Sequence, residues 1–369
     1  MENIKKIGID CRMVKESGIG RYIFNLIVNL SKIDTKNHYY LFYFNFKDLD
    51  LELPANFHLI SAPIRWHSFS EQSSMLKIIN SYNLDLYHSP HPNMPFFYSK
   101  KFIITIHDLT MLKEMTGRAS TYFFPVYYLK WLVFKIMLSR AVRNSEKIIT
   151  VSEFVKKEIV STFNISENKV EVIYNGVPEK IQKKESSEIE SVLKKFKITK
   201  PYLFYVGNAY PHKNLERLVL AFTLFNLESK YELVLGGKED FFYKRLMKDS
   251  RNLSSLKFLG ELTDEEISAL YSGCQAFVYP SISEGFGIQI IEAIKCEARV
   301  ICSNNTSFPE IAGDYAFYFN PLNVEDIKKC LAENINAPYK DKLSKSQNRL
   351  DKFSWKLSAQ QHYDLFKKI

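Results

Sequence analysis

The chain has 369 residues, 46% of them hydrophobic and 25% charged, so it is long enough for two domains that each bury a core. Its five cysteines are odd in number and scattered, with no CxxC spacing, which argues against disulfides and structural zinc and for a reducing, cytoplasmic compartment. The net charge of +9 suits an anionic ligand or membrane surface, and without an RNA- or DNA-binding signature it predicts no nucleic-acid partner.

Strand-like runs alternate with helical patterns along the chain. The expected strands are residues 4–10, 39–45, 57–61, 85–88, 102–106, 147–151, 170–173, 202–206, 232–235, 256–258, 276–279 and 299–302. Helical periods fall between them, at residues 21–30, 153–163, 215–227, 264–271 and 288–295. This alternation predicts an α/β fold with two Rossmann-like parallel-sheet domains facing a central cleft.

The charged segment after Pro178 is the best candidate for a domain boundary. It predicts a first domain at 1–178, a linker at 179–199 and a second domain at 200–352. Residues 353–369 form a last helix that can pack back on the first domain. The aromatic-rich segment 122–138 contains Pro125, Lys130 and Lys135 and is too short to span a bilayer, so it predicts a buried or half-exposed helix with lipid contact as an alternative.

The stretch SEGFGIQIIE at 283–292 carries the strongest chemical signal. It follows a strand-like run, and its two glycines allow close approach of a ligand to a helix N-terminus, which attracts phosphate. Glu284 and Glu292 are expected about 9–12 Å apart, which matches the span from the sugar to the ribose of a nucleotide sugar. The alternative is a cap residue followed by a solvated helix glutamate.

Three further motifs follow strand-like runs. The glycines of SGIGRY at 17–22 can approach a diphosphate, although a third Rossmann glycine is missing. His107 lies at the carboxyl end of a strand, where it can bind a sugar hydroxyl or remain a core histidine. Lys213, between a glycine turn and a helix, can bind phosphate or be an idle surface lysine.

No metal site is predicted. His88 and His91 have HxxH spacing, but Pro90 breaks the helix that such a site needs. Asp48-Leu49-Asp50 has the DxD pattern of some metal sites, but it lies in a polar connection far from the other candidates in the sequence.

Taken in order, these pieces resemble the retaining glycosyltransferases of family 4, which have the GT-B fold. The pieces that carry the resemblance are SGIGRY (17–22), TIHDL (105–109), TVSEF (150–154), VIYNGV (172–177), YVGNAYPHKNLERL (205–218), EGFGIQIIEA (284–293) and FSW (353–355). The spaced glutamates match the E-x7-E signature of that family. The resemblance covers nearly the whole chain and is closest to its mannosyltransferase-like branch.

The resemblance implies catalytic roles for His107 and Glu284, both at the donor sugar. It implies donor contacts from Gly20, Asn208, His212, Lys213, Glu284, Gly285, Phe286, Gly287 and Glu292. Within this set Glu292 would hold the ribose and Lys213 the diphosphate. Family members often have arginine where this chain has Asn208, so fewer cations would hold the diphosphate, with help from His212.

The implied activity is transfer of a hexose from a nucleotide sugar to a hydroxyl with retention of configuration, without a metal or other cofactor. GDP-mannose is the favoured donor and a UDP-sugar is open. The acceptor would be a polysaccharide, an O-antigen or a lipid-linked glycan, and the enzyme would be cytoplasmic, with peripheral contact at the inner face of the membrane left open. Two alternatives stay open: a GT-B-like nucleotide-sugar epimerase and a donor-binding partner subunit without turnover.

Overall fold

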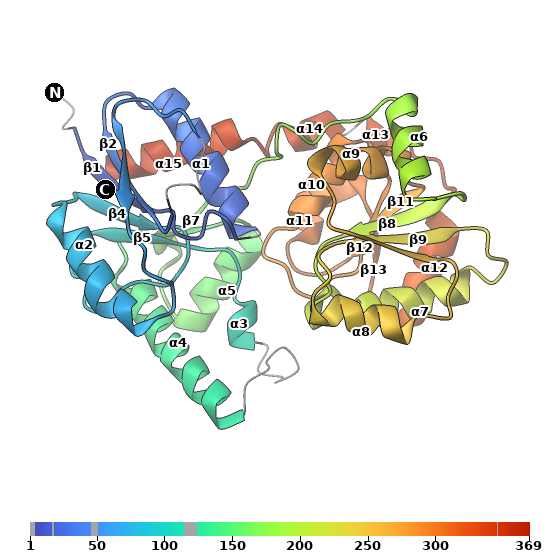
Figure 1. Cartoon of the computed structure of the whole chain (residues 1–369), viewed down its shortest axis with the longest axis horizontal. Coiled ribbons are helices and arrows are strands. Elements are labelled where there is room, and N and C mark those ends of the chain that lie inside the picture. The colour runs from blue at the N-terminus through green and yellow to red at the C-terminus, as the bar shows by residue number, and fades with distance from the viewer. Residues whose placement is uncertain (1–3, 17, 46–50, 114–123, 345) are drawn as a thin grey trace. The chain divides into compact units, whose positions relative to one another are not determined.

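The structure is a computed structural model that describes residues 4–16, 18–45, 51–113, 124–344 and 346–369 (Figure 1). It divides into two compact units. The first unit contains residues 1–176 together with 354–369, and the second contains residues 177–353. The segment 179–199, expected as a linker, lies in the second unit and includes a helix with a capping box between Glu185 and Glu188.

The first unit is built on a seven-stranded parallel sheet of order β3-β2-β1-β4-β5-β6-β7. Its strands are β1 (Lys6–Asp10), β2 (His38–Tyr43), β3 (Phe57–Ser61), β4 (Leu86–Ser89), β5 (Phe102–Ile106), β6 (Lys147–Thr150) and β7 (Val170–Val172). Every residue of β4 and β5 is buried, as expected for central strands that helices cover on both faces.

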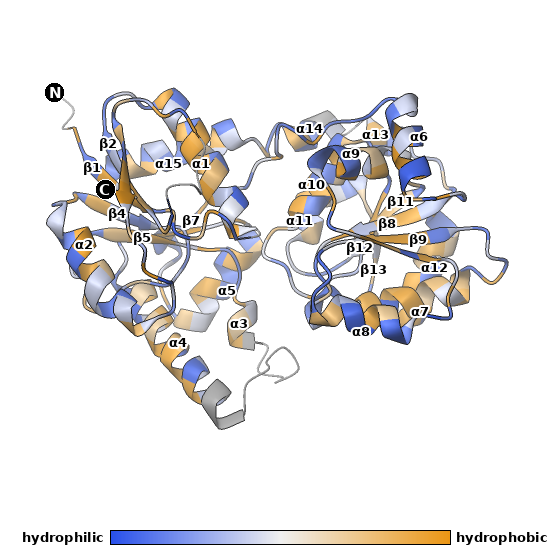
Figure 2. Cartoon of the chain, in the orientation of Figure 1, coloured by the Kyte–Doolittle hydropathy of each residue, from blue (hydrophilic) through white to orange (hydrophobic). Residues whose placement is uncertain are grey.

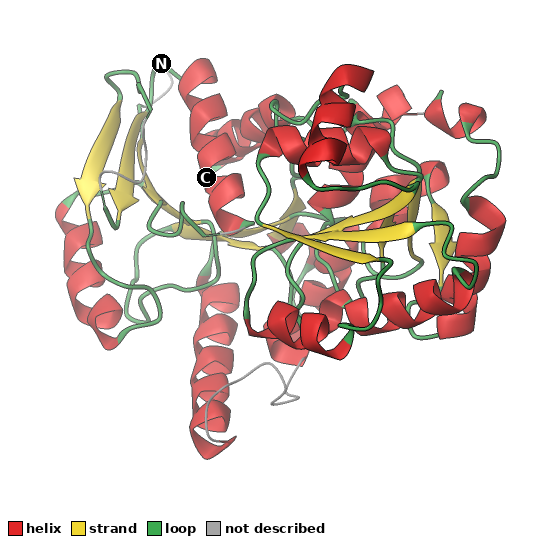
Figure 3. Ribbon diagram, turned by 45° about the vertical axis from the view of Figure 1, so that its right-hand side comes forward, coloured by secondary structure: helices red, strands yellow, loops and turns green. Residues whose placement is uncertain are grey.

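Helices cover both faces of this sheet. They are α1 (Ile19–Ile33), a π-helical turn (Glu71–Met75) that leads into α2 (Leu76–Ser81), α3 (Thr110–Lys113), α4 (Phe124–Asn144), α5 (Glu153–Phe163), a 3-10 turn (Glu167–Lys169) and α15 (Trp355–Lys368). The C-terminal helix α15 packs beside α1, whereas α2, α4 and α5 lie on the opposite face (Figures 1 and 3). Residues from both ends of the chain therefore build the first unit.

The second unit has a six-stranded parallel sheet of order β10-β9-β8-β11-β12-β13. Its strands are β8 (Tyr202–Val206), β9 (Glu232–Gly236), β10 (Leu256–Gly260), β11 (Ala276–Tyr279), β12 (Val300–Ser303) and β13 (Phe317–Phe319). Its helices are α6 (Ser186–Lys195), α7 (Leu215–Phe225), α8 (Phe241–Asp249), α9 (Asp264–Gly273), α10 (Ile288–Lys295), α11 (Phe308–Ala312), α12 (Val324–Asn334), α13 (Lys340–Leu343) and α14 (Ser346–Leu350), with 3-10 turns at Pro211–Lys213 and Gly313–Tyr315.

Both sheets reverse their strand order at the centre, between β1 and β4 in the first unit and between β8 and β11 in the second. Ligands of open parallel sheets bind beyond the carboxyl ends of the strands at such a switch point. In the first unit this edge gathers the segments that follow Asp10, Ser89 and Ile106. In the second it gathers the segments that follow Val206 and Tyr279.

Candidate active site

Lys213 and Glu284 form an ion pair at the carboxyl edge of the second sheet. Lys213 closes the 3-10 turn that follows β8, and Glu284 lies in the loop that follows β11. The two loops meet because β8 and β11 are paired neighbours. Only 10% of the lysine side chain and 15% of the glutamate side chain are exposed, so the pair is largely withdrawn from water.

Tyr279, the last residue of β11, completes this cluster. Its hydroxyl lies 2.9 Å from Oε1 of Glu284, and the Lys213 ammonium lies 3.4 Å from the same hydroxyl. Burial opposes ionisation of Glu284, but the Lys213 charge and these hydrogen bonds outweigh it and hold the pKa of the carboxyl below its usual value. The cluster therefore presents a carboxylate for sugar hydroxyls beside an ammonium that can bind an anion. Sequence reasoning overlooked Tyr279, although its place at a strand end was a signal.

The loop between Glu284 and α10 has a backbone that requires glycine. Gly287 adopts φ +84° at the N-cap of α10, and an added Cβ would lie 2.8 Å from the Phe308 ring. The Ser307 hydroxyl lies 3.0 Å from the carbonyl oxygen of Phe286 and 3.3 Å from that of Glu284, so its one proton can be shared between them and hold the loop in place. Gly285, like Phe286 and Gly287, is buried. The helix start is thus rigidly built, as an anion site needs.

Glu292 lies within α10 and is only 1% exposed. Tyr271 of α9 donates a 3.3 Å hydrogen bond to its Oε2 atom. This burial excludes the alternative of a solvated helix glutamate. The predicted ribose contact stays a prediction, and Tyr271, which no sequence motif marked, holds the carboxylate in place.

Asn208 and His212 lie in the loop between β8 and Lys213, and both are half-buried. The Asn208 carbonyl accepts a 2.7 Å hydrogen bond from the Tyr205 hydroxyl, which fixes the backbone at this position. The His212 carbonyl accepts from the Ile282 N–H at 2.7 Å, which joins the two loops of the site. Their side-chain roles toward a donor stay predictions.

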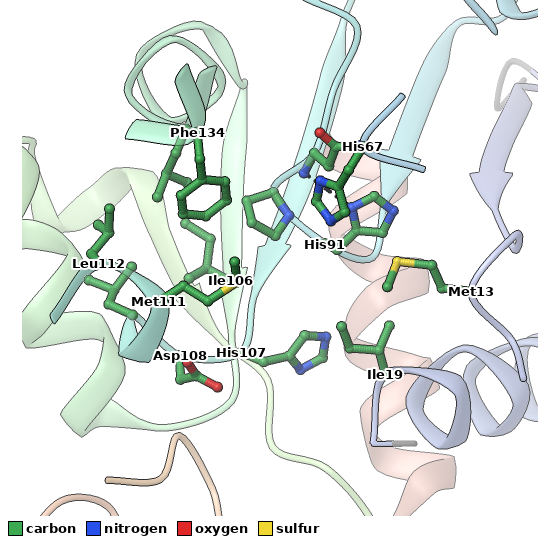
Figure 4. Close-up of a pocket in the computed structure, with 14 residues that line it drawn as sticks. Met13, Ile19, His67, His91, Ile106, His107, Asp108, Met111, Leu112 and Phe134 are labelled. Atoms are coloured by element: carbon green, nitrogen blue, oxygen red, sulfur yellow. Dashed lines mark hydrogen bonds between the residues drawn. The ribbon is translucent and has the colours of Figure 1, made fainter. Parts of the chain in front are cut away.

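In the first unit, a pocket of about 180 Å³ lies at the carboxyl ends of β1, β4 and β5 (Figure 4). His107 lines it, and its Nε2 lies 2.9 Å from the Pro90 carbonyl. That carbonyl can only accept, so Nε2 carries the proton and Nδ1 is an acceptor in the neutral ring. Burial lowers the pKa of His107, which favours this neutral form. The pocket lining is otherwise mainly apolar, with Phe134 and Leu138 of α4 among it.

A buried ionic network that sequence reasoning missed supports this pocket. The Arg12 guanidinium lies 2.6 Å from both Asp10 and Glu71, and all three side chains are at most 1% exposed. Glu71 in turn accepts hydrogen bonds from the Asn93 side chain and from the His67 N–H. Although burial opposes ionisation, Arg12 holds the pKa of Asp10 well below its usual range. In the sequence, the only indication of this network was that the charged residues Asp10 and Arg12 lie at the end of the first strand.

Gly20 is required for packing of its own loop. Its N–H donates to the Glu16 carbonyl at 2.9 Å, and an added Cβ would lie 2.3 Å from the Val14 carbonyl oxygen. The Gly20 N–H is thus occupied in this conformation, and its contact with a diphosphate stays a prediction.

The histidines of the HxxH pattern have separate partners. His88 Nε2 lies 2.9 Å from Thr105 Oγ1, whereas His91 Nδ1 accepts from the Asn93 N–H. Within the described part of the chain, no three His, Cys, Asp or Glu side chains are grouped so that they could hold a metal ion. The DxD pattern at 48–50 lies outside the described residues.

The two parallel-sheet units, each with its candidate residues at the carboxyl ends of its strands, have the architecture of the GT-B fold, and comparison with known proteins identifies the class as glycosyltransferases. A model of the group 1 glycosyl transferases matches residues 187–354, and a model of glycosyltransferase family 4 matches residues 17–180. The chain belongs to glycosyltransferase family 4.

Two of the similar proteins are O-antigen mannosyltransferases. The O-antigen chain mannosyltransferase B of Escherichia coli is 27% identical over 300 residues, which cover 78% of this chain and 76% of that protein. The O-antigen chain mannosyltransferase RfbU of Salmonella typhimurium is 27% identical over 297 residues, which cover 79% of this chain and 76% of that protein.

Solved structures share the fold. Sucrose-phosphate synthase of Thermosynechococcus elongatus superposes with a TM-score of 0.76 at 17% identity, covering 99% of this chain and 98% of that chain. Anabaena HepE in complex with UDP-glucose superposes with a TM-score of 0.73 at 15% identity, covering 99% of this chain and 100% of that chain.

Proposed function

We propose that this glycosyltransferase is a retaining mannosyltransferase that uses GDP-mannose as donor and a glycan as acceptor. The Lys213–Glu284 pair at the start of α10 carries the proposal, because it places an ammonium for a diphosphate beside a carboxylate for sugar hydroxyls. The kinship with O-antigen mannosyltransferases supports mannose as the transferred sugar and an O-antigen, polysaccharide or lipid-linked glycan as acceptor.

The residues then take the following roles. Lys213 neutralises the diphosphate with help from His212 and the backbone at Asn208, while Gly20 approaches it and Glu292 holds the ribose. Gly285, Phe286 and Gly287 line the sugar and phosphate with their backbone, and His107 and Glu284 contact the sugar. The bond from the anomeric carbon to the phosphate breaks, and the departing phosphate takes the proton of the hydroxyl that attacks on the same face. No protein nucleophile and no metal is needed in this scheme.

A thermal-shift screen with GDP, UDP and ADP tests the donor assignment. A ligand that binds the native state stabilises it by mass action, so GDP should raise the melting temperature most. A larger shift with UDP would contradict the assignment. Incubation with GDP-mannose tests the reaction: release of GDP supports a transferase, a rearranged nucleotide sugar would identify an epimerase, and binding without turnover would identify a partner subunit.

Helix α4 supports a second proposal, peripheral contact with an anionic membrane. Its residues Leu129, Leu132, Val133 and Ile136 recur at helical spacing and are 61%, 38%, 48% and 53% exposed. At 100° per residue, Lys130 and Lys135 flank this stripe on its two sides. Figure 2 colours much of α4 as hydrophobic.

An exposed apolar stripe with flanking lysines is typical of a helix that lies in the membrane interface. None of the helices in the described residues is long and apolar enough to cross a membrane. We place this contact at the inner face, in the cytoplasm, and the five unpaired cysteines support a reducing compartment.

A further inference from the structure

A chain of buried hydrogen bonds joins the C-terminal helix to the strands beneath the His107 pocket. Tyr22 of α1 lies at its centre, with its Oη atom 2.6 Å from His362 Nε2 and 3.0 Å from Thr105 Oγ1. Thr105 Oγ1 lies 2.9 Å from His88 Nε2, and His362 Nδ1 lies 2.7 Å from the Ser358 carbonyl oxygen. This series of hydrogen bonds therefore links α1, β4, β5 and α15.

The donors and acceptors of this chain have one consistent direction. The Ser358 carbonyl can only accept, so His362 Nδ1 carries the proton and Nε2 accepts from the Tyr22 hydroxyl. Tyr22 then accepts from Thr105, and Thr105 accepts from the Nε2–H of His88. Burial lowers the pKa of His362 to about 4, so the ring is uncharged at neutral pH, as this direction needs.

The Tyr22 ring is in contact with the proposed catalytic histidine. Its centroid lies 4.9 Å from that of His107, and the ring planes meet at 84°, an edge-to-face arrangement. His107 follows β5 directly, two residues after Thr105 of the same chain of bonds. The imidazole is thus held by the Pro90 carbonyl at Nε2 and by the Tyr22 ring, which leaves Nδ1 as its acceptor atom.

We propose that Tyr22 is a positioning residue for His107 and that His362 of α15 locks Tyr22 in place. This inference rests on the proposed contact of His107 with the transferred sugar. Removal of the Tyr22 hydroxyl, which lies in the middle of this series of hydrogen bonds, leaves Nε2 of His362 without its donor and frees the Tyr22 ring to shift. Since His107 would act where charge develops at the sugar, a small displacement should lower kcat more than it changes the donor KM.

Tyr22→Phe and His362→Phe test the proposal, with GDP release from GDP-mannose as the assay and water as acceptor. Each should lower kcat on the order of tenfold with little change in KM. His362→Gln, whose side-chain oxygen can accept from Tyr22, should recover part of the loss. In a His107→Ala background, Tyr22→Phe should cause no further loss, because the two residues would act as one unit.

Tyr39→Phe is the matched control. The Tyr39 hydroxyl is buried in the same unit and donates a 2.7 Å hydrogen bond to Asp34. Tyr39→Phe therefore removes a buried hydroxyl that has no link to His107. This variant should lose stability and keep wild-type kcat. Imidazole nitrogen spectra give a readout independent of activity: the His107 ring signals should shift in Tyr22→Phe and stay unchanged in Tyr39→Phe.

Two results would overturn the inference. The first is an equal loss of kcat from Tyr22→Phe with and without His107, and the second is an unchanged His107 spectrum in Tyr22→Phe. A wild-type kcat in His107→Ala would refute the proposed role of His107 itself, so failure of the proposed function is distinguishable from failure of the positioning role.

Discussion

Lys213 and Glu284 are 71 residues apart in the chain, yet their side chains meet at the carboxyl edge of the second sheet, beyond the paired strands β8 and β11. The pair is largely withdrawn from water, and Tyr279 hydrogen-bonds the carboxylate. A buried ion pair contributes little net stability, but loss of one partner leaves the other charge buried and uncompensated. The pair that we propose to bind the donor should therefore also control the stability of the unit.

Lys213→Met should destabilise the protein by about 3–5 kcal/mol at pH 7, because Glu284 then stays buried without its cation. In the wild type the folded-state pKa of Glu284 is lowered, so its stabilising contribution is present at neutral pH and is lost as the pH falls through that value. In Lys213→Met the lysine charge is absent, so burial favours protonation of Glu284 and the carboxyl can become neutral as the pH falls. The stability deficit of Lys213→Met should therefore shrink between pH 7 and pH 4 in urea unfolding.

Lys328→Met is the control for this experiment. Lys328 pairs with Glu325 at 2.9 Å on an exposed helix surface, where a salt bridge contributes about 0–1 kcal/mol. The loss of unfolding free energy in Lys213→Met could instead stay constant with pH or equal the loss in the control. Either result would contradict the claim that Glu284 is buried without compensation in this variant. Lys213→Met/Glu284→Gln should recover part of the stability, because neither charge remains.

Gly287→Ala should be more damaging than Gly260→Ala. Both glycines have positive φ, +84° and +72°, so each alanine variant carries backbone strain of about 1–3 kcal/mol. Only the Cβ at 287 meets another side chain, 2.8 Å from Phe308, whereas the Cβ at 260 meets open space. Denaturant unfolding should show the larger loss for Gly287→Ala, and only that variant should raise the donor KM. Equal losses would mean that Phe308 moves aside freely.

Much of the fold could be predicted because alternation of strand and helix periods is a local property of the sequence. The helix at 153–163 was predicted to the residue, since Ser152 caps it and Asn164 ends it in a left-handed conformation. The three-residue strand β13 (Phe317–Phe319) was missed, because so short a run carries no period.

The loop residues of the candidate site could be predicted from the sequence, but the buried residues that hold these loops in place could not. Glycine loops and strand ends mark Lys213 and Glu284 in the sequence. The contact of Arg12 with Glu71, 59 residues away, depends on how distant segments pack, and nothing in a local pattern encodes it. The same holds for Tyr22 and His362, which are 340 residues apart.

The α4 stripe should bind vesicles that contain phosphatidylglycerol, and binding should weaken as salt screens the lysines. Serine at Leu132, Val133 and Ile136 should reduce flotation with vesicles without unfolding the protein, because these side chains are already exposed. The matched control places serine at Leu220 and Leu224, which are 50% and 37% exposed on α7. Absence of binding at low ionic strength would remove the proposal.

The two glutamates of the α10 loop should differ in their kinetic effects. Glu292 is proposed to bind the ribose, which does not change during the reaction, so Glu292→Ala should raise the donor KM with a smaller effect on kcat. Loss of charge-assisted hydrogen bonds of about 1.5–3 kcal/mol corresponds to roughly ten- to a hundredfold in affinity.

Glu284→Ala and His107→Ala should lose mainly kcat, on the order of 10²–10³-fold, because their contacts are proposed to strengthen where charge develops at the sugar. Glu333→Ala, on the exposed surface of α12, controls for loss of a carboxylate and should leave both constants unchanged. Each variant needs a native circular-dichroism spectrum, since Glu292 is buried and bonded to Tyr271. If Glu292→Ala loses kcat alone while Glu284→Ala changes only KM, the roles of the two carboxylates are the reverse of those proposed.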